Sequence, residues 1–365
     1  MSVRDVNENS LMPVSINLLY DGMIAQDDIY DADGDRLLIR SGNVLNYDQI
    51  ERIKGLNSGR STIYVTGRTH HFMVTKRPNI EIESRSEVED SSGYTKSKNI
   101  TFEILEEIAK DKVVNQASLH DVSSELSSRL ESTPPGVIIS LINAMAPVDE
   151  YLQRHSVNVS LLNGLIGRWM GLPGDRVDRL VLIGLLHDCG KTQLPSKVLN
   201  APRKLTVVEF EVIKMHAVFT FDLLSEFTQD VRFAASSHHE RLDGSGYPKG
   251  LHKDELSLEA RIIAISDIYE AMVSQRAYKG PASPFSIMAL LERLSDKELD
   301  GELVNVFKEN MPKELIDKPV MMSDGTIGVV REVDPEDIEY PIVEHGRYPI
   351  KTSEDLYCVS MYNDD

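Results

Sequence analysis

Residues 238–250 read HHERLDGSGYPKG, two adjacent histidines followed by a loop with three glycines and a proline. Neutral imidazole is a common metal ligand near neutral pH. Glycine allows the backbone to approach a bound ligand closely, and proline fixes the turns of such a loop. Core packing alone does not explain this combination. The stretch therefore predicts part of a metal site, to which other segments of the chain must bring the remaining ligands.

Size and composition narrow the class of protein. The chain has 365 residues, 41% hydrophobic and 27% charged, which at about 150 residues per domain predicts two to three domains. The net charge of −19 argues against binding nucleic acid polymers or an anionic membrane, because both require excess Lys and Arg. Two cysteines, Cys189 and Cys358, are typical of a reducing compartment. No apolar run has the length of a signal peptide or a membrane span, so we expect a cytoplasmic protein.

Helical periodicity dominates the middle of the chain and predicts a mainly α fold. We expect a small α+β N-terminal accessory domain at 1–80, with a regulatory role. Residues 81–100 are polar and poor in apolar side chains, which predicts a linker. The helical domain then spans 101–318, and residues 319–365 form a short β appendage of about three strands with a hairpin turn at Asp324-Gly325.

Metal-capable side chains occur on or beside five apolar helices of the middle domain. They are His155, the doublet His187-Asp188, His216, the pair His238-His239, and Asp267. Each alone has a simpler explanation, since a lone histidine on a helix is more often a hydrogen-bonded core or surface residue. Together they are hard to explain that way, because polar groups on apolar helices are costly unless they find partners. The joint pattern predicts one shared site.

The predicted ligands favour a dinuclear hydrolytic centre. Histidines and carboxylates without a cysteine ligand suit iron, manganese or another first-row divalent ion rather than structural zinc. Two such ions about 3.5–4 Å apart can share a hydroxide and clamp the oxygens of a phosphoryl transfer. Asp188 is the natural bridge, because its two oxygens can reach both ions. Lys191 is placed to neutralise a phosphate oxygen, although alone a lysine at a helix end is more often simply solvated.

Residues 145–312 resemble the HD-GYP family, cyclic dinucleotide phosphodiesterases of the HD superfamily of metal-dependent phosphohydrolases. The resemblance is carried by His187-Asp188-Cys189-Gly190-Lys191, by Gly246-Tyr247-Pro248, and by the apolar helix that leads to Asp267. It implies a helical-bundle HD-type catalytic domain whose substrate is cyclic di-GMP. The metal ligands it implies are His155, His187, Asp188, His216, His238, His239 and Asp267. Lys191 would contact phosphate, Tyr247 would line the substrate groove, and Arg276 and Lys279 would contact substrate phosphates.

One departure from the family lies four residues before His155. Members with three metals carry a glutamate there, whereas this chain has Tyr151. Glu150 cannot replace it, because a shift of one residue turns a side chain by about 100° around a helix. We therefore expect two divalent ions, Fe or Mn, and no third. Cys189 stands where an aliphatic residue is common, and we favour core filling over redox sensitivity.

Three functional hypotheses follow. The leading one is metal-dependent hydrolysis of cyclic di-GMP, in which a bridging hydroxide attacks phosphorus and the ribose 3′ oxygen leaves, giving linear pGpG; further hydrolysis to GMP stays open. The alternatives are a catalytically weak cyclic-dinucleotide receptor, favoured only by Tyr151, and another HD-type nucleotide phosphohydrolase. By resemblance, diguanylate cyclase (GGDEF) domains are candidate protein partners. The native metal and the formation of a homodimer stay open.

Overall fold

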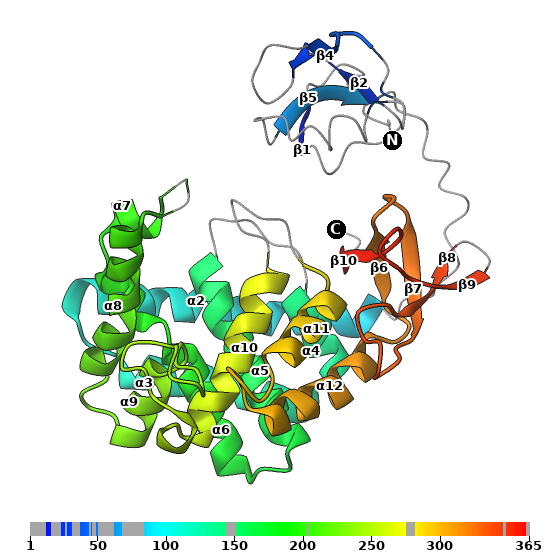
Figure 1. Cartoon of the computed structure of the whole chain (residues 1–365). Helices are drawn as coiled ribbons and strands as arrows, with labels where there is room; N and C mark the ends of the chain where they lie inside the picture. The colour runs from blue at the N-terminus through cyan, green and yellow to red at the C-terminus, as the bar shows by residue number, and fades with distance from the viewer. Residues whose placement is uncertain are drawn as a thin grey trace, which may run out of the picture. The chain divides into compact units, whose positions relative to one another are not determined.

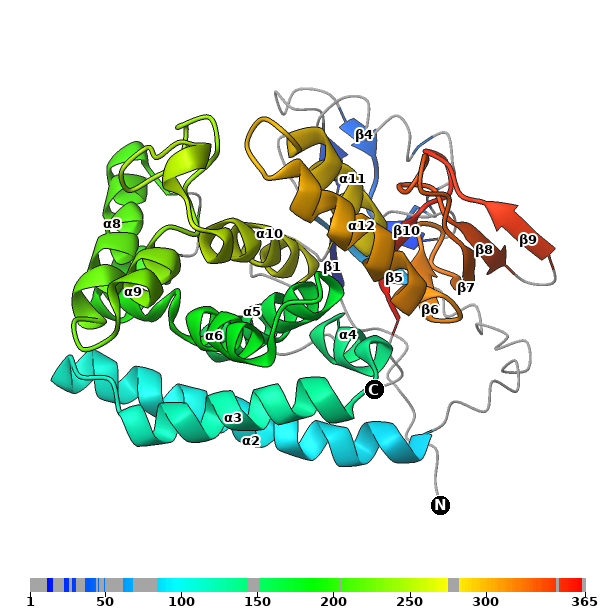
Figure 2. The same ribbon diagram turned by 90° about the horizontal axis from the view of Figure 1, so that it is seen from below.

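A bundle of helices occupies the middle of the chain and confirms the mainly α fold class (Figures 1 and 2). The computed structural model describes residues 12–15, 23–25, 28–30, 37–43, 45, 49, 62–67, 84–143, 151–201, 203, 205–274, 282–345 and 348–362. The chain divides into two units, Met1–Ile82 and Glu83–Asp365. In the described part of the chain, none of the helices combines the length and the apolar character that a membrane span requires.

The N-terminal unit contains short antiparallel strands. β1 (Met12–Ser15), β5 (Thr62–Gly67) and β2 (Met23–Ala25) form one sheet in the order β1-β5-β2, and β3 (Ile29–Tyr30) pairs with β4 (Leu37–Ile39). Ala25, Ile29 and Ile39 are buried. The helical part expected in this unit falls almost wholly outside the described residues.

The larger unit is built from helices packed around a central antiparallel pair. Its helices are α2 (Ser84–Asp111), α3 (Gln116–Ser132), α4 (Pro135–Asn143), α5 (Tyr151–Trp169), α6 (Gly174–Leu186), α7 (Ser196–Leu199), α8 (Val207–Leu223), α9 (Gln229–Ser236), α10 (Leu258–Val273), α11 (Pro284–Leu294) and α12 (Gly301–Leu315), with the 3₁₀ helices η3 (Cys189–Gln193) and η4 (Lys253–Glu255). In Figure 2, α5 and α6 lie between α2 and α3 on one side and α10 on the other. α5 and α6 pack closely because Gly184 has no side chain: a Cβ there would lie 2.6 Å from Ser160 Cα.

Local capping explains where several of these helices begin. Thr206 and Glu209 form a capping box at the start of α8, with each side chain bonded to the backbone of the other residue. The Ser257 side chain accepts a hydrogen bond from the Ala260 amide at the start of α10, at 3.2 Å. α8 and α10 carry two of the predicted metal ligands, so these caps help to fix where the ligands lie.

The predicted linker at 81–100 is wrong for residues 84–100, which form the first part of α2. Tyr94 and Ser97 are buried, and the Tyr94 hydroxyl donates a hydrogen bond to Asn158 Oδ1 on α5 at 2.6 Å. Few apolar side chains are available in this stretch, yet helices in proteins draw most of their stability from tertiary packing. A narrow buried face against α5 and α3 is therefore sufficient, and composition alone pointed to a loop.

The C-terminal residues form an antiparallel sheet of five strands, in the order β10-β6-β7-β8-β9. The strands are β6 (Pro319–Met322), β7 (Ile327–Glu332), β8 (Ile342–His345), β9 (Tyr348–Lys351) and β10 (Cys358–Met361). The β appendage is thus confirmed, but the prediction of about three strands missed β8 and β9. In β9, Pro349 argues against a strand. Val320, Val330 and Val343 belong to the same buried core as the helices.

Candidate metal centre

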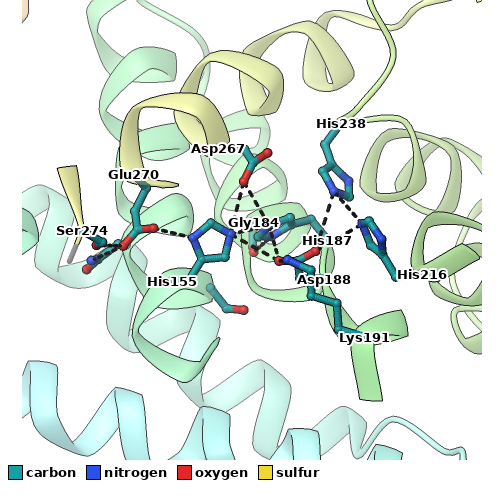
Figure 3. A network of polar contacts seen from close by, with 12 residues as sticks. His155, Gly184, His187, Asp188, Lys191, His216, His238, Asp267, Glu270 and Ser274 are labelled. Carbon is teal, nitrogen blue, oxygen red and sulfur yellow. Dashed lines mark hydrogen bonds and ion pairs between the residues drawn. The ribbon is translucent and has the colours of Figure 1, made fainter. Parts of the chain in front are cut away.

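All seven predicted ligand residues meet in the middle of the helical unit. They come from five segments: His155 from α5, His187 and Asp188 from the junction of α6 and η3, His216 from α8, His238 and His239 from the end of α9, and Asp267 from α10. Figure 3 shows six of them, with His155 and Asp267 on one side of Asp188 and His216 and His238 on the other. The side chains form two groups that share carboxylates.

The first group surrounds His155 Nε2. This nitrogen lies 3.1 Å from His187 Nε2, 3.3 Å from Asp188 Oδ2 and 3.2 Å from Asp267 Oδ1. The three side chains of His155, His187 and Asp188 are buried, and their ligand atoms lie within 4.8 Å of one another. Two imidazole nitrogens and carboxylate oxygens converge on one point, as a divalent cation requires.

The second group consists of His216, His238 and His239, whose ligand atoms also lie within 4.8 Å of one another. His216 Nε2 and His238 Nε2 are 3.4 and 3.7 Å from Asp188 Oδ1, and 3.3 Å from each other. His239 Nδ1 lies 3.7 Å from Asp267 Oδ2. Asp188 therefore reaches one group through each oxygen, and Asp267 does the same.

Three of the histidines have their tautomer fixed in the same way. In His187, His216 and His238, Nδ1 lies within hydrogen-bonding distance of a backbone carbonyl three residues earlier in the chain. The acceptors are the carbonyl oxygens of Gly184, Ile213 and Ala235, at 2.7, 2.6 and 2.8 Å respectively. An Nδ1–H donated to a carbonyl leaves the Nε2 lone pair free, and each Nε2 faces Asp188. This is the arrangement that metal-binding histidines adopt.

The electrostatics of the centre keep its ligands in their binding forms. Burial lowers the pKa of His216 and, more strongly, of His238, and lowers that of His239 to about 3, so these rings are neutral. Burial acts to raise the pKa of Asp188, but the Lys191 ammonium and His187 outweigh it and hold that pKa well below its ordinary value. A metal requires neutral imidazole and ionised carboxylate, and the fold supplies both.

One buried carboxylate oxygen of the centre further indicates that these residues fit divalent metal ions. Asp188 Oδ1 is buried, and no hydrogen bond from the described residues reaches it. A buried carboxylate oxygen without a partner is costly. His216 and His238 point unprotonated nitrogens at the same place, so they cannot donate to this oxygen. A cation between them would satisfy all three atoms.

Glu270 is a polar residue of the centre that the sequence analysis did not assign. It lies on α10 one helical turn after Asp267, and its carboxylate accepts from His155 Nδ1 (Figure 3). Asn158 Nδ2 and Ser274 Oγ donate to its other oxygen at 2.9 and 2.6 Å. Burial acts to raise the pKa of Glu270, but His155 prevails and lowers it to about 2. The three-residue spacing from Asp267 was the available signal, because it places both carboxylates on one buried face.

Lys191 and Tyr247 lie at the edge of the centre. Lys191 Nζ forms an ion pair with Asp188 Oδ2. The Tyr247 ring lies against the His239 ring, with centroids 4.6 Å apart and an interplanar angle of 31°. Its backbone amide donates to the His239 carbonyl at 3.1 Å, which folds the 244–250 loop back onto the histidine pair.

The structure describes the side chain at only one of the four remaining positions singled out from the sequence. Arg276 and Lys279 fall within 275–281, outside the described residues, and the Tyr151 side chain is likewise not described. Cys189 is fully buried, and burial raises its pKa to about 12. It fills the core and presents no thiolate, as we expected.

Comparison with known proteins places this arrangement in a family. Residues 139–303 match the model of a family described as HD domain. The Bdellovibrio bacteriovorus structure of Bd1817, an HDG"Y"P protein, covers 83% of this chain and 100% of its own, with a TM-score of 0.50 and 14% identity, which shows similarity of fold. Residues 139–303, which include all seven candidate ligands, are thus similar to an HD domain.

The relatives narrow the class further. A cyclic di-GMP phosphodiesterase of Thermotoga maritima is 35% identical over 49% of this chain and 50% of its own length. The cyclic di-GMP phosphodiesterase PA4108 of Pseudomonas aeruginosa is 30% identical over 65% of this chain and 58% of its own length. A 3'3'-cGAMP-specific phosphodiesterase of Vibrio cholerae is 33% identical over 48% of this chain and 41% of its own length. The chain spans about half the length of the curated relatives it matches, and over the matched residues it is similar to cyclic dinucleotide phosphodiesterases of the HD-GYP type.

Proposed function

We propose that the chain is a metal-dependent phosphodiesterase that hydrolyses cyclic di-GMP to linear pGpG. The observation that carries the proposal is the pair of histidine groups that share Asp188 and Asp267. Two of the relatives named above are cyclic di-GMP phosphodiesterases. Because another relative is specific for 3'3'-cGAMP, that dinucleotide is the second candidate substrate.

The proposed centre binds two divalent ions, iron or manganese. His155 and His187 would hold one ion and His216, His238 and His239 the other, with the two aspartates between them. A bound pair of such cations lowers the pKa of water and stabilises negative charge on phosphodiester oxygens. We propose no third ion, since Tyr151 provides no carboxylate one helical turn before His155.

Residues at the edge of the centre would orient the phosphodiester. Lys191 can exchange its pairing with Asp188 for a phosphate oxygen, because a bound cation would replace it as the partner of that carboxylate. Tyr247 forms one wall of the proposed substrate groove, beside His239. Arg276 and Lys279, by family resemblance, would contact the phosphates as well.

An aromatic surface beside Tyr247 suits a purine base. Phe210 on α8 is 46% exposed, and its ring centroid lies 6.5 Å from that of Tyr247, at 80°. Lys214 Nζ lies 5.1 Å from the Phe210 centroid and 5.6 Å from the Tyr247 centroid, and it also pairs with Glu211 at 2.7 Å. Base stacking on an aromatic ring contributes about 1–3 kcal/mol. We assign Phe210 and Tyr247 to base binding.

The remaining assignments rest on sequence and resemblance. The N-terminal unit would be regulatory, diguanylate cyclase (GGDEF) domains would be protein partners, and the two cysteines favour a cytoplasmic protein.

The test is a product assay on chain stripped of metal and reloaded anaerobically with Fe²⁺ or Mn²⁺. Cyclic di-GMP and 3'3'-cGAMP are supplied separately, and linear and mononucleotide products are separated by chromatography. The expected result is metal-dependent formation of pGpG, abolished by chelator. Turnover that survives complete metal removal would overturn the mechanism. Tight binding without product under every metal would favour the receptor alternative.

A further inference from the structure

A continuous line of hydrogen bonds connects helix α2 with the metal centre. The Tyr94 hydroxyl on α2 donates to Asn158 Oδ1 at 2.6 Å, and Asn158 Nδ2 donates to Glu270 Oε1 at 2.9 Å. The other oxygen of Glu270 accepts from His155 Nδ1. All four side chains are buried. Because the Glu270 carboxylate can only accept, Asn158 donates to it through Nδ2 and accepts from Tyr94 through Oδ1.

This line sets the tautomer of His155. A carboxylate can only accept, so Glu270 holds the proton on Nδ1 and leaves the Nε2 lone pair facing His187, Asp188 and Asp267. The other three histidines with a fixed tautomer use a carbonyl three residues away on their own segment. His155 instead depends on a side chain of α10, which is oriented in turn from α5 and α2.

A second contact joins α2 to the segment that follows Asp188. Gln193, at the end of η3, donates from Nε2 to the Ile108 carbonyl on α2 at 3.3 Å. η3 follows Asp188 directly and contains Lys191. α2 therefore contacts the segment that carries the shared carboxylate as well as the line to His155. It is also the helix that leads out of the N-terminal unit.

We propose that Tyr94 is a positioning residue for the metal ligand His155, acting through Asn158 and Glu270, so that α2 sets the affinity of the first histidine group for its ion. The inference rests on the proposed metal binding. Because α2 follows the N-terminal unit directly in the chain, a displacement of α2 along its axis would change the Tyr94–Asn158 hydrogen bond and, through it, the orientation of His155.

The experiment measures Mn²⁺ binding by equilibrium dialysis and electron paramagnetic resonance on the full chain, with Tyr94→Phe as the variant. The control is Tyr269→Phe, which also removes one buried hydroxyl, hydrogen-bonded to Asn143 at 3.2 Å and outside the line to His155. Changing a partner of a metal-binding histidine costs about 10–100-fold in metal affinity. We expect this for Glu270→Gln, whose amide would donate to Nδ1 and move the proton to Nε2. For Tyr94→Phe, two hydrogen bonds further out, we expect about 3–10-fold.

The loss should affect one ion only, so that an intermediate Mn²⁺ concentration leaves Tyr94→Phe with one bound ion where the unmodified chain has two. A purely structural role would instead lower the unfolding temperature of metal-free protein and weaken both ions together. Unchanged Mn²⁺ affinity in Tyr94→Phe, or an equal loss in Tyr269→Phe, would overturn the inference. The readout needs no substrate, so a chain that fails to hydrolyse cyclic di-GMP can still confirm it.

Discussion

Replacement of Gly190 by alanine should separate the two halves of the metal centre. Gly190 lies in η3, two residues after Asp188, and its backbone packs directly against α8. A Cβ there would lie 2.0 Å from the His216 carbonyl oxygen and 2.5 Å from the Thr220 amide nitrogen. Both are backbone atoms, so no side-chain rotation relieves the contact.

The displacement that Gly190→Ala requires can be worked out from these distances. Ordinary contact begins at 3.4 Å, so η3 and α8 must move apart by about 1.4 Å. The junction is held by the Gly190 amide donating to Thr220 Oγ1 and by this hydroxyl donating to the His187 carbonyl, both at 3.0 Å. Overpacking of this kind costs about 1–3 kcal/mol. Moving α8 also draws His216 Nε2 away from Asp188 Oδ1, now 3.4 Å apart.

Two measurements test this prediction. Urea unfolding of the metal-free Gly190→Ala variant should show a free energy of unfolding lower by about 1–3 kcal/mol. Metal analysis should show loss of the ion held by the His216 group. Gly174→Ala is the matched control, because a Cβ at this first residue of α6 meets nothing within 4 Å. A Gly190→Ala protein with unaltered stability and full metal content would refute the reasoning.

Four further outcomes are expected. Asp188→Asn should lower the content of both ions, since this carboxylate reaches both histidine groups; metal analysis showing one ion fully retained would contradict a shared ligand. Burial holds the pKa of His238 well below 6.5 in the folded chain. Below pH 6.5 the unfolded chain therefore binds more protons than the folded chain. The free energy of unfolding of metal-free protein should fall with pH there, by up to about 1.4 kcal/mol per pH unit from this group. A flat urea-unfolding profile between pH 8 and 5 would exclude this. Phe210→Ala should raise KM for the cyclic dinucleotide about 10-fold with little change in kcat. Val207→Ala on the same helix, at an 81% exposed position, should change neither. Equal KM values for the two variants would exclude Phe210 from the base site. Cys189 should resist thiol reagents until the chain is denatured, and rapid modification of native protein would contradict its burial.

The sequence predicted the candidate ligands that meet in the structure, but not the residues that position them. His155, His187 and His216 could be found because a histidine on an apolar helix needs a polar partner, and several such helices pointed to the same need. Glu270 occupies a similar position, yet its partner lies 115 residues away in the chain, and no local pattern indicates which helix crosses α10 at that point. The contact of Tyr94 with α5 was harder still to predict, because the polar residues around Tyr94 indicated a linker.

Asp267 shows most clearly where prediction from sequence stops. Its place in an apolar helix indicated a ligand, and Asp188 alone was expected to bridge. In the structure Asp267 spans the two groups as well, with Oδ1 3.2 Å from His155 Nε2 and Oδ2 3.7 Å from His239 Nδ1. Spanning depends on the angle at which α10 crosses α5 and the end of α9, which the packing of whole helices determines. The chemistry of a ligand is local, but its sharing between two groups is a property of the bundle.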